Sequence, residues 1–193
     1  MKEELMKNNE DILSLLYLAK QIGWKKMNKN SIQRIMYLLQ VLYSFKHQGA
    51  NIFGNFHFNT TLYGPYSSEI ENSVSFLDSN EMIIVENGEI VLNAEQAYIT
   101  KDEGKIVWMR NLLLILGKYG EKNVFALTIN DPEYENTIMA NKTTVLDSNN
   151  PQNETYLKLQ EFKDCFEQTI TDTSKIDDDE YLSMYFDYIF SHI

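Results

Sequence analysis

The feature that most constrains the fold is a pair of β-rich runs joined by Asn87-Gly88. The runs are 82–86 before this dipeptide and 89–92 after it, and all their residues are apolar except the glutamates that flank Asn-Gly, Glu86 and Glu89. Asn-Gly supplies the two positive φ angles that a type I′ turn requires, and such turns join adjacent antiparallel strands. The sequence therefore predicts a β-hairpin over 82–92.

The segments before this hairpin have the apolar periodicity of helices, with apolar residues recurring every three or four positions. Three helices are expected there, over 11–23, from Asn30 or Ser31 to Gly49, and over 67–79. Between the second and the third, the aromatic and β-branched run 52–63 predicts a short strand. In that strand Leu62 falls on the same face as two phenylalanines.

Two of the predicted helices begin with the pattern of a capping box, in which Ser or Thr is followed three residues later by Glu. Ser68 with Glu71 fits the pattern in the third helix, and Thr100 with Glu103 fits it in a helix expected over 101–118. This last helix is apolar nearly all round, so it is either central to a core or covered by a partner.

The last third of the chain has a helical and acidic composition. Helices are expected over 121–129, 132–140 and 154–170, with a loop over 142–152. A final helix should begin at the acidic run 177–180, because carboxylates suit the positive end of a helix dipole.

The order of these elements is helix, helix, strand, helix, hairpin, helix, which is the order of a winged-helix domain. We therefore expect an α+β, mostly helical fold. A winged helix-turn-helix domain would span 11–118, and a C-terminal α-helical extension would span 119–193. In this arrangement the hairpin is the wing, and helix 67–79 takes the place of the recognition helix.

Two stretches within this order resemble a known family. They are Ile-Gln-Arg-Ile-Met-Tyr-Leu-Leu at 32–39 and Tyr-Gly-Pro-Tyr-Ser-Ser-Glu-Ile at 63–70. Together with the wing they resemble the YwgA-like family of bacterial winged-helix proteins and, more distantly, the SocA/Panacea antitoxin domain. The resemblance covers somewhat more than half of the chain. It implies an accessory subunit of a prokaryotic defence or antitoxin-like complex. One such role is the middle component of a Lamassu-type antiviral system, with an SMC-like ATPase and an effector as protein partners.

Charge is distributed unevenly along this acidic chain, whose formal net charge is −11. Residues 20–46 carry six basic side chains and no acid. Such a segment can bind a phosphate backbone or an acidic protein surface, or it can be a solvated connection between helices. The candidate contacts are Lys25, Lys26, Lys29 and Arg34.

The expected recognition helix has the opposite character. Its outer face would hold Glu69, Asn72, Ser73, Phe76 and Asn80, and residues 64–80 contain no basic side chain. Carboxylates near phosphates weaken binding, so this helix is unsuited to reading DNA and better suited to a protein partner. Aromatic residues are the candidate anchors for such a partner, although aromatic residues near a turn are more often core. They are Tyr63, Tyr66, Phe76, Tyr181, Tyr185 and Tyr188.

The motifs of common enzymes are missing. The single cysteine, Cys165, provides no disulfide framework, and the three histidines share no ligand spacing. The acidic run 177–180 lacks the alternating spacing of an EF-hand loop. We therefore expect no catalytic residue, no cofactor and no metal site.

Two functions remain open at this point. The first is a non-enzymatic adaptor that binds protein partners, and the alternative is a DNA-binding transcriptional regulator that uses the basic segment 20–46. The chain has no apolar stretch of eighteen residues, and its first four residues lack the apolar block of a signal peptide. We therefore expect a cytoplasmic protein that makes no membrane contact.

Overall fold

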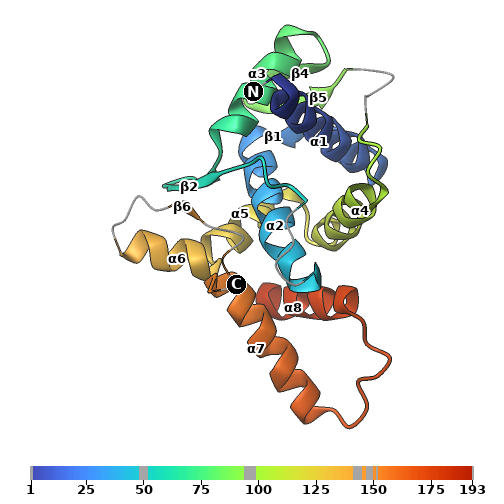
Figure 1. Cartoon of the computed structure of the whole chain (residues 1–193), viewed down its shortest axis with the longest axis vertical. Helices are drawn as coiled ribbons and strands as arrows, with labels where there is room; N and C mark the ends of the chain where they lie inside the picture. Colours follow the sequence, from blue (N-terminus) through green and yellow to red (C-terminus); the bar gives the residue numbers. More distant parts are fainter. Residues whose placement is uncertain are drawn as a thin grey trace.

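The computed structural model of the chain describes residues 2–47, 52–93, 99–140, 145–146, 150 and 152–192. Within these ranges the fold is α+β and mostly helical (Figure 1). The helices are α1 (Lys2–Gln21), α2 (Lys29–His47), α3 (Ser68–Ser79), α4 (Glu103–Gly117), α5 (Glu121–Ile129), α6 (Pro132–Met139), α7 (Glu154–Thr169) and α8 (Asp178–His192). The strands are β1 (Met27–Asn28), β2 (Phe58–Thr61), β3 (Gly64–Tyr66), β4 (Ile83–Glu86), β5 (Glu89–Leu92) and β6 (Val145–Leu146).

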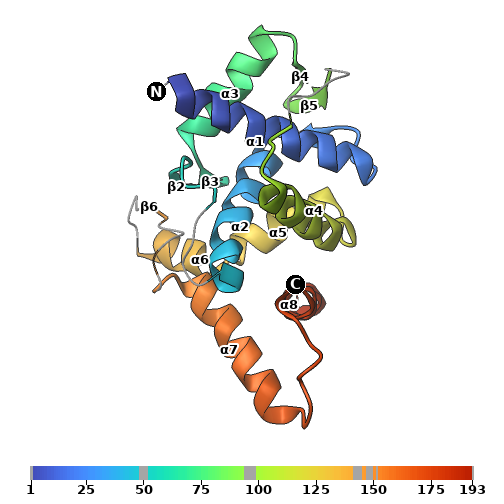
Figure 2. The ribbon, with the colours of Figure 1, turned by 45° about the vertical axis from the view of Figure 1, so that its right-hand side comes forward.

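Helix α2 runs through the middle of the molecule (Figures 1 and 2). Helices α4, α5 and α7 and strand β3 all pack against it. It is buried nearly all round, as expected for a helix whose neighbours cover every face. Three long polar side chains, Gln33, Arg34 and Gln40, are therefore enclosed in the interior, where their hydrogen bonds must come from other protein groups.

The predicted hairpin over 82–92 is confirmed. Strands β4 and β5 pair antiparallel, and Asn87 and Gly88 have φ angles of 52° and 80°. Strand β1 joins the other edge of β5, with Met27 opposite Ile90, so this sheet has the order β1-β5-β4.

A second sheet has the order β3-β2-β6. The strand expected over 52–63 is shorter than predicted, because only Phe58–Thr61 forms β2. The loop expected over 142–152 is wrong in part, since Val145 and Leu146 form β6 and pair with β2. Burial of Leu146 against the core accounts for this pairing, because only 2% of the residue is exposed.

Several helix ends differ from the prediction. Helix α1 begins at Lys2 rather than at Asp11, because its first half also finds a packing partner in α3. Gly49, the predicted end of the second helix, lies outside the described residues. Helices α5 and α6 begin where they were predicted, and Asp131 caps α6 by accepting a hydrogen bond from the Tyr134 backbone amide.

Both predicted capping boxes are wrong. The cap of α3 is Ser67, whose side chain makes no capping bond, and Glu71 pairs instead with Lys29. In α4 the Asp102 carboxylate accepts from the backbone amide of Lys105 at 3.1 Å. Aspartate is as good a cap as threonine, and the Thr100 hydroxyl is used one step earlier, where it accepts from the Asp102 amide.

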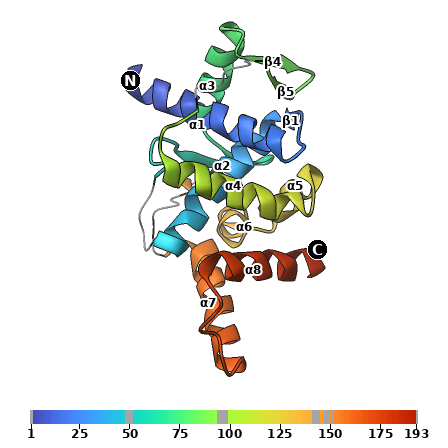
Figure 3. The same ribbon diagram turned by 90° about the vertical axis from the view of Figure 1, so that its right-hand side faces the viewer.

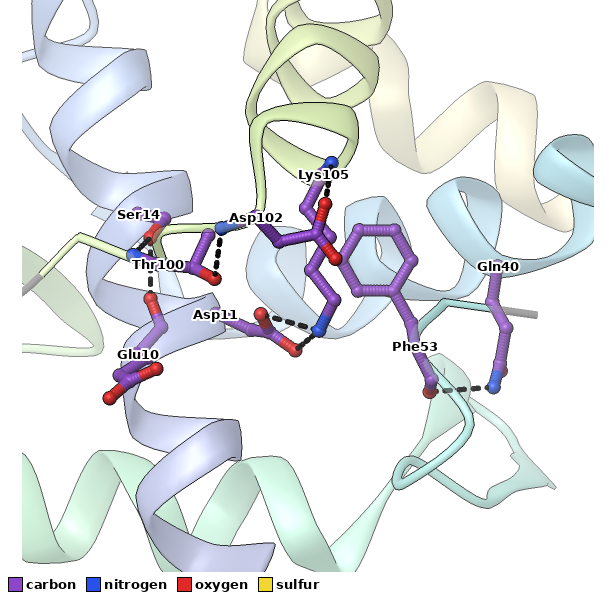
Figure 4. A network of polar contacts seen from close by, with 8 residues as sticks. All are labelled: Glu10, Asp11, Ser14, Gln40, Phe53, Thr100, Asp102 and Lys105. Atoms are coloured by element: carbon purple, nitrogen blue, oxygen red, sulfur yellow. Dashed lines mark hydrogen bonds and ion pairs between the residues drawn. The ribbon is translucent and has the colours of Figure 1, made fainter.

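Helix α4 is joined to α1 by a polar network (Figure 4). The Lys105 ammonium lies 2.7 and 2.9 Å from the two carboxylate oxygens of Asp11 and 5.0 Å from the centre of the Phe53 ring. The Ser14 hydroxyl accepts from the Thr100 backbone amide at 2.9 Å. Burial raises the pKa of Asp11 to about 6 even though Lys105 opposes this shift. This network fixes the chain where it returns from the β4–β5 sheet.

The last four helices share the core of the elements before them. One hydrophobic cluster extends from Ile12 on α1 to Phe186 on α8. Helix α7 packs on α2 at one end and then extends away from the rest of the molecule, and α8 returns to pack against α7 and α4 (Figure 3).

Candidate functional site

Bulky apolar side chains are exposed at the turn between β2 and β3. Leu62 is 84% exposed and Tyr63 is 72% exposed, which makes them two of the three most exposed large apolar residues that the structure describes. Tyr66, on β3, is 38% exposed. We call Leu62, Tyr63 and Tyr66 the hairpin tip. Apolar groups gathered on a surface in this way are a common sign of an interaction site.

Arg34 of α2 binds the backbone of the hairpin tip. The Arg34 guanidinium donates a hydrogen bond to the Tyr63 carbonyl at 2.7 Å. Gly64 follows with a φ of 116°, and a Cβ atom at this position would lie 3.2 Å from Arg34 Nε. Only glycine combines this backbone angle with such a close approach, so the turn and the guanidinium fit one another.

Thr61 and Tyr134 make further hydrogen bonds to the backbone of this turn. The Thr61 hydroxyl donates to the Gly64 carbonyl at 2.8 Å and accepts from the Tyr63 amide at 3.2 Å. The Tyr134 hydroxyl, from α6, donates to the Thr61 carbonyl at 2.6 Å. The exposed turn is therefore tied to α6 as well as to α2.

Gln33, which precedes Arg34 in the sequence, binds the backbone where the chain leaves β3. Its side-chain amide donates to the Ser67 carbonyl at 3.1 Å and accepts from the Ser67 amide at 2.8 Å. A glutamine side chain thus replaces the two hydrogen bonds that a neighbouring strand would provide. It sets the point at which β3 ends and α3 begins.

Arg34 is itself unusual, because only 7% of the residue is exposed. Its guanidinium lies 4.5 Å from the centre of the Phe125 ring, and among the described residues no carboxylate forms an ion pair with it. Burial lowers the pKa of Arg34 below its ordinary value. The expectation that Arg34 faces a partner is therefore wrong: its cation is used inside the protein, to hold the tip.

A surface pocket of about 270 Å³ lies beside the tip. Its lining combines the two tip tyrosines with polar groups of α2 and β2: Asn30, Gln33, Thr61, Tyr63, Pro65 and Tyr66. The exposed rings therefore stand next to a concave surface, a shape that a side chain from a partner can fill.

The basic segment 20–46 does not form a free positive surface. Lys26 pairs with Glu89 of the β4–β5 hairpin at 2.5 Å, Lys29 pairs with Glu71 of α3, and Lys46 pairs with Asp179 of α8 at 2.6 Å. Of the predicted contacts, Lys25 alone is both exposed and outside an ion pair within the described part of the chain. Carboxylates far away in the sequence thus pair with three of the six cations, and Lys20 and Lys25 are the exposed ones outside an ion pair among the described residues, which the linear charge count could not show.

The C-terminal tyrosines separate into two kinds. Tyr181 and Tyr185 are 1% and 6% exposed, so the prediction that they contact a partner is wrong. They pack edge-on against Phe166 and Phe162 of α7 and so join α7 to α8. Tyr188 is 51% exposed and remains on the surface.

The outer face of α3 is largely as predicted. Phe76 is 42% exposed, and Asn72 and Asn80 are exposed as well, whereas Ser73 is buried and does not belong to this face. Leu62 is the site residue that sequence reasoning missed. The strand pattern grouped it with Phe58, but β2 ends at Thr61 and leaves Leu62 in the turn.

Other kinds of site find no support within the described ranges. No group of three or more His, Cys, Asp or Glu side chains in those ranges could hold a metal ion. None of the described helices has both the length and the apolar character of a membrane span.

Residues 32–39 and 63–70 meet at the hairpin tip. Gln33 and Arg34 come from the first stretch, and their partners Ser67 and Tyr63 come from the second. Comparison of the chain with protein-family models, with curated proteins and with solved structures gave no match.

Proposed function

We propose that this chain is a non-enzymatic adaptor subunit and that it binds a protein partner through the hairpin tip. The observation that carries the proposal is the contrast between Leu62 and Tyr63, which face the solvent, and Arg34, which is buried to hold their backbone. Burying an arginine without a carboxylate partner costs free energy. An arrangement of this kind is expected where a fixed backbone serves binding.

Preorganisation explains why such an arrangement favours binding. A partner that binds a mobile loop must order its backbone, at roughly 1–2 kcal/mol for each residue that becomes fixed. Here the backbone of the turn is already fixed by Arg34, Thr61 and Tyr134. Tyrosine is also among the residues that contribute most to protein interfaces. The tip therefore presents its apolar side chains on a backbone that needs no further ordering.

The arrangement of the first sheet supports a winged-helix interpretation. In this interpretation α1, α2 and α3 are the three helices, and β4–β5 is the wing, with β1 pairing to β5. The resemblance to the YwgA-like family then gives the setting that we propose, a prokaryotic antiviral-defence or antitoxin-like complex. Its protein partners would include an SMC-like ATPase and an effector.

The alternative function, a DNA-binding transcriptional regulator, has weaker support. A DNA-binding surface needs free Lys and Arg side chains near the phosphates. Within segment 20–46, Lys26, Lys29 and Lys46 are paired with the protein's own carboxylates, and Arg34 is buried. The face of α3 that would enter the groove carries no basic residue.

Affinity purification from the native host tests the proposal. Wild-type protein is compared with a Leu62→Ser/Tyr63→Ser variant and with Met139→Ser, a control that removes an apolar side chain 75% exposed at the end of α6. All three should have the same thermal stability, because the changed side chains lie at the surface. We expect the wild type and the control to retain the same protein partner and the tip variant to lose it.

Duplex DNA binding by the pure protein is measured in parallel, at about 50 and about 200 mM salt, the range over which phosphate contacts reveal themselves. Retention of the partner by the tip variant would contradict the proposed site. Tight, salt-dependent binding of DNA that is lost when Lys25 is changed to Glu would favour the regulator instead.

A further inference from the structure

A second apolar surface lies where the first half of α1 packs against the end of α3, which crosses it (Figures 1 and 2). It is a groove of about 320 Å³. Leu13 and Leu77 form its floor and are nearly fully buried, whereas Met6 and Phe76 form its walls and are 57% and 42% exposed. The groove shares no residue with the hairpin tip, so the two surfaces can be tested separately.

One polar group in this groove lacks a hydrogen bond. Asn9 belongs to the lining and is 6% exposed, and its side-chain oxygen has no hydrogen-bond partner among the described residues. A buried amide without a partner is costly, at about 1–3 kcal/mol. This oxygen is itself closed off from solvent, so the features of the groove that indicate its occupant are the exposed apolar walls and the surrounding charge.

The surroundings of the groove are strongly acidic. Glu10 lies in the lining itself. The segments that build the groove, 3–13 and 64–93, contain ten carboxylates and a single basic side chain, Lys7. Four of these carboxylates already form ion pairs with lysines: Glu3 with Lys7, Asp11 with Lys105, Glu71 with Lys29 and Glu89 with Lys26. The negative charge that an occupant would meet is therefore mainly that of Glu10 in the lining and of Glu81 beside Met82. An occupant with positive charges next to its apolar groups would fit this surface, and an acidic one would be repelled.

We propose that the groove binds an amphipathic helix of a protein partner, whose apolar stripe is flanked by lysine or arginine. A cleft between two helices that is apolar inside and charged at its edge is the usual receptor for such a helix. A second copy of the chain suits the groove poorly, because the chain has a net charge of −11 and two such grooves would bring carboxylates together. This inference extends the adaptor proposal by a second binding surface and by the chemistry of its ligand.

The probe for this proposal is a displayed library of peptides of about 16 residues, long enough to form a helix. Leucine is fixed at positions i, i+3, i+4 and i+7, and the remaining positions are random. The library is selected on the wild-type protein after depletion on a Phe76→Ser variant. We expect the recovered peptides to be enriched in Lys and Arg beside the leucines. Their affinity should fall at least about tenfold on Phe76→Ser and on Met6→Ser, as expected for anchor contacts.

Two controls keep the result specific to the groove. Leu114→Ser should bind the recovered peptides as tightly as the wild type does, since Leu114 is also exposed and apolar but lies on α4, outside the lining of the groove. Glu10→Gln should weaken them severalfold and reduce the dependence on salt. Thermal unfolding of each variant establishes that it is folded.

Three results would overturn the proposal. The first is a selection in which no peptide distinguishes the wild type from Phe76→Ser. The second is recovery of peptides that are no richer in Lys and Arg than the unselected library. The third is a dimer in sedimentation analysis that Phe76→Ser dissociates, which would assign the groove to self-association. Because the hairpin-tip residues are unchanged in all these variants, failure here leaves the proposed function of the tip intact, and failure of the tip leaves this result intact.

Discussion

The β4–β5 hairpin closes through its own two turn residues, whereas the β2–β3 hairpin is closed by side chains that distant helices supply. In the first, Asn87 and Gly88 adopt the positive φ angles that suit strand twist. In the second, neither Leu62 nor Tyr63 has a positive φ, and Arg34 and Tyr134 hold the turn instead. The turn of the first hairpin is set by its own residues, whereas the turn of the second also depends on side chains from α2 and α6.

The two turns also differ in what they show to the solvent. The β4–β5 turn is polar, with Glu86 and Glu89 beside the Asn-Gly pair. The β2–β3 turn exposes leucine and tyrosine. A turn that only connects two strands needs no apolar side chains and no buried arginine. The difference between the hairpins is therefore what the proposal that the second one binds a partner explains.

The largest effect should come from replacing the glycine of each turn by alanine. Gly64→Ala should destabilise the protein by about 3 kcal/mol, because it adds strain at positive φ to a clash with the buried Arg34. Gly88→Ala should cost only about 1 kcal/mol, because its Cβ would meet no atom within 4 Å. Urea unfolding measures both, and equal costs would remove the distinction between the two hairpins.

The next effect concerns the side chains that support each hairpin. Gln33→Leu should cost about 2 kcal/mol, because both buried backbone groups of Ser67 lose their partner. Glu89→Ala should cost less than about 0.5 kcal/mol, because the Lys26–Glu89 ion pair is exposed. A larger loss of stability in Glu89→Ala than in Gln33→Leu would show that side chains from elsewhere in the chain support the β4–β5 hairpin more than the β2–β3 hairpin.

A smaller effect should appear as a dependence of stability on pH. Burial raises the pKa of Asp131, the cap of α6, to about 6, although Thr155, Tyr134 and Tyr37 donate hydrogen bonds to it. Since the folded state then binds more protons than the unfolded state between pH 4 and pH 6, stability falls as pH rises through this window. By linkage this group should make the protein about 1 kcal/mol more stable at pH 5 than at pH 7.

Asp131→Asn is the control for that measurement, because it keeps the size of the side chain and removes its titration. The wild type and the variant are compared by urea unfolding at the two pH values, which subtracts the contribution of Asp11. An unchanged pH dependence in Asp131→Asn would show that Asp131 is not the group responsible. Hydrogen exchange should locate the effect in Thr61–Tyr66, which α6 supports through Tyr134, and not in β4–β5.

The sequence predicts the structures that depend on local signals and misses those that depend on contacts between distant residues. The β4–β5 hairpin, α3 and α5 were predicted closely, because their signals are local: an Asn-Gly turn and an apolar period. The burial of Arg34 and the pairing of Lys29 with Glu71 could not be predicted, because they depend on residues far away in the chain. Tyr181 and Tyr185 were misplaced for a related reason: a helical period shows that a face is apolar but not what covers it.

Of the candidate site, the sequence identified Tyr63 and Tyr66 but not the reason for their exposure. Tyr-Gly-Pro-Tyr marks a turn, and Gly64 in it can be recognised as a glycine that a turn requires. The alternation that placed Leu62 on the inner face of a strand continued one residue beyond the end of β2. Strand ends are set by pairing with β3 and β6, which the sequence alone does not reveal.

We propose that the β2–β3 turn, and not the β4–β5 hairpin, binds a protein partner. It is tested most directly by titration calorimetry of the purified partner against three proteins: the wild type, Leu62→Ser/Tyr63→Ser, and Ile84→Ser/Val91→Ser, which removes a cross-strand pair of residues each 40% exposed on β4–β5. Loss of two anchor side chains should weaken binding by about 100-fold or more, and loss of the β4–β5 pair should change it less than about twofold. Undiminished binding by the first variant, or a large loss in the second, would contradict the account.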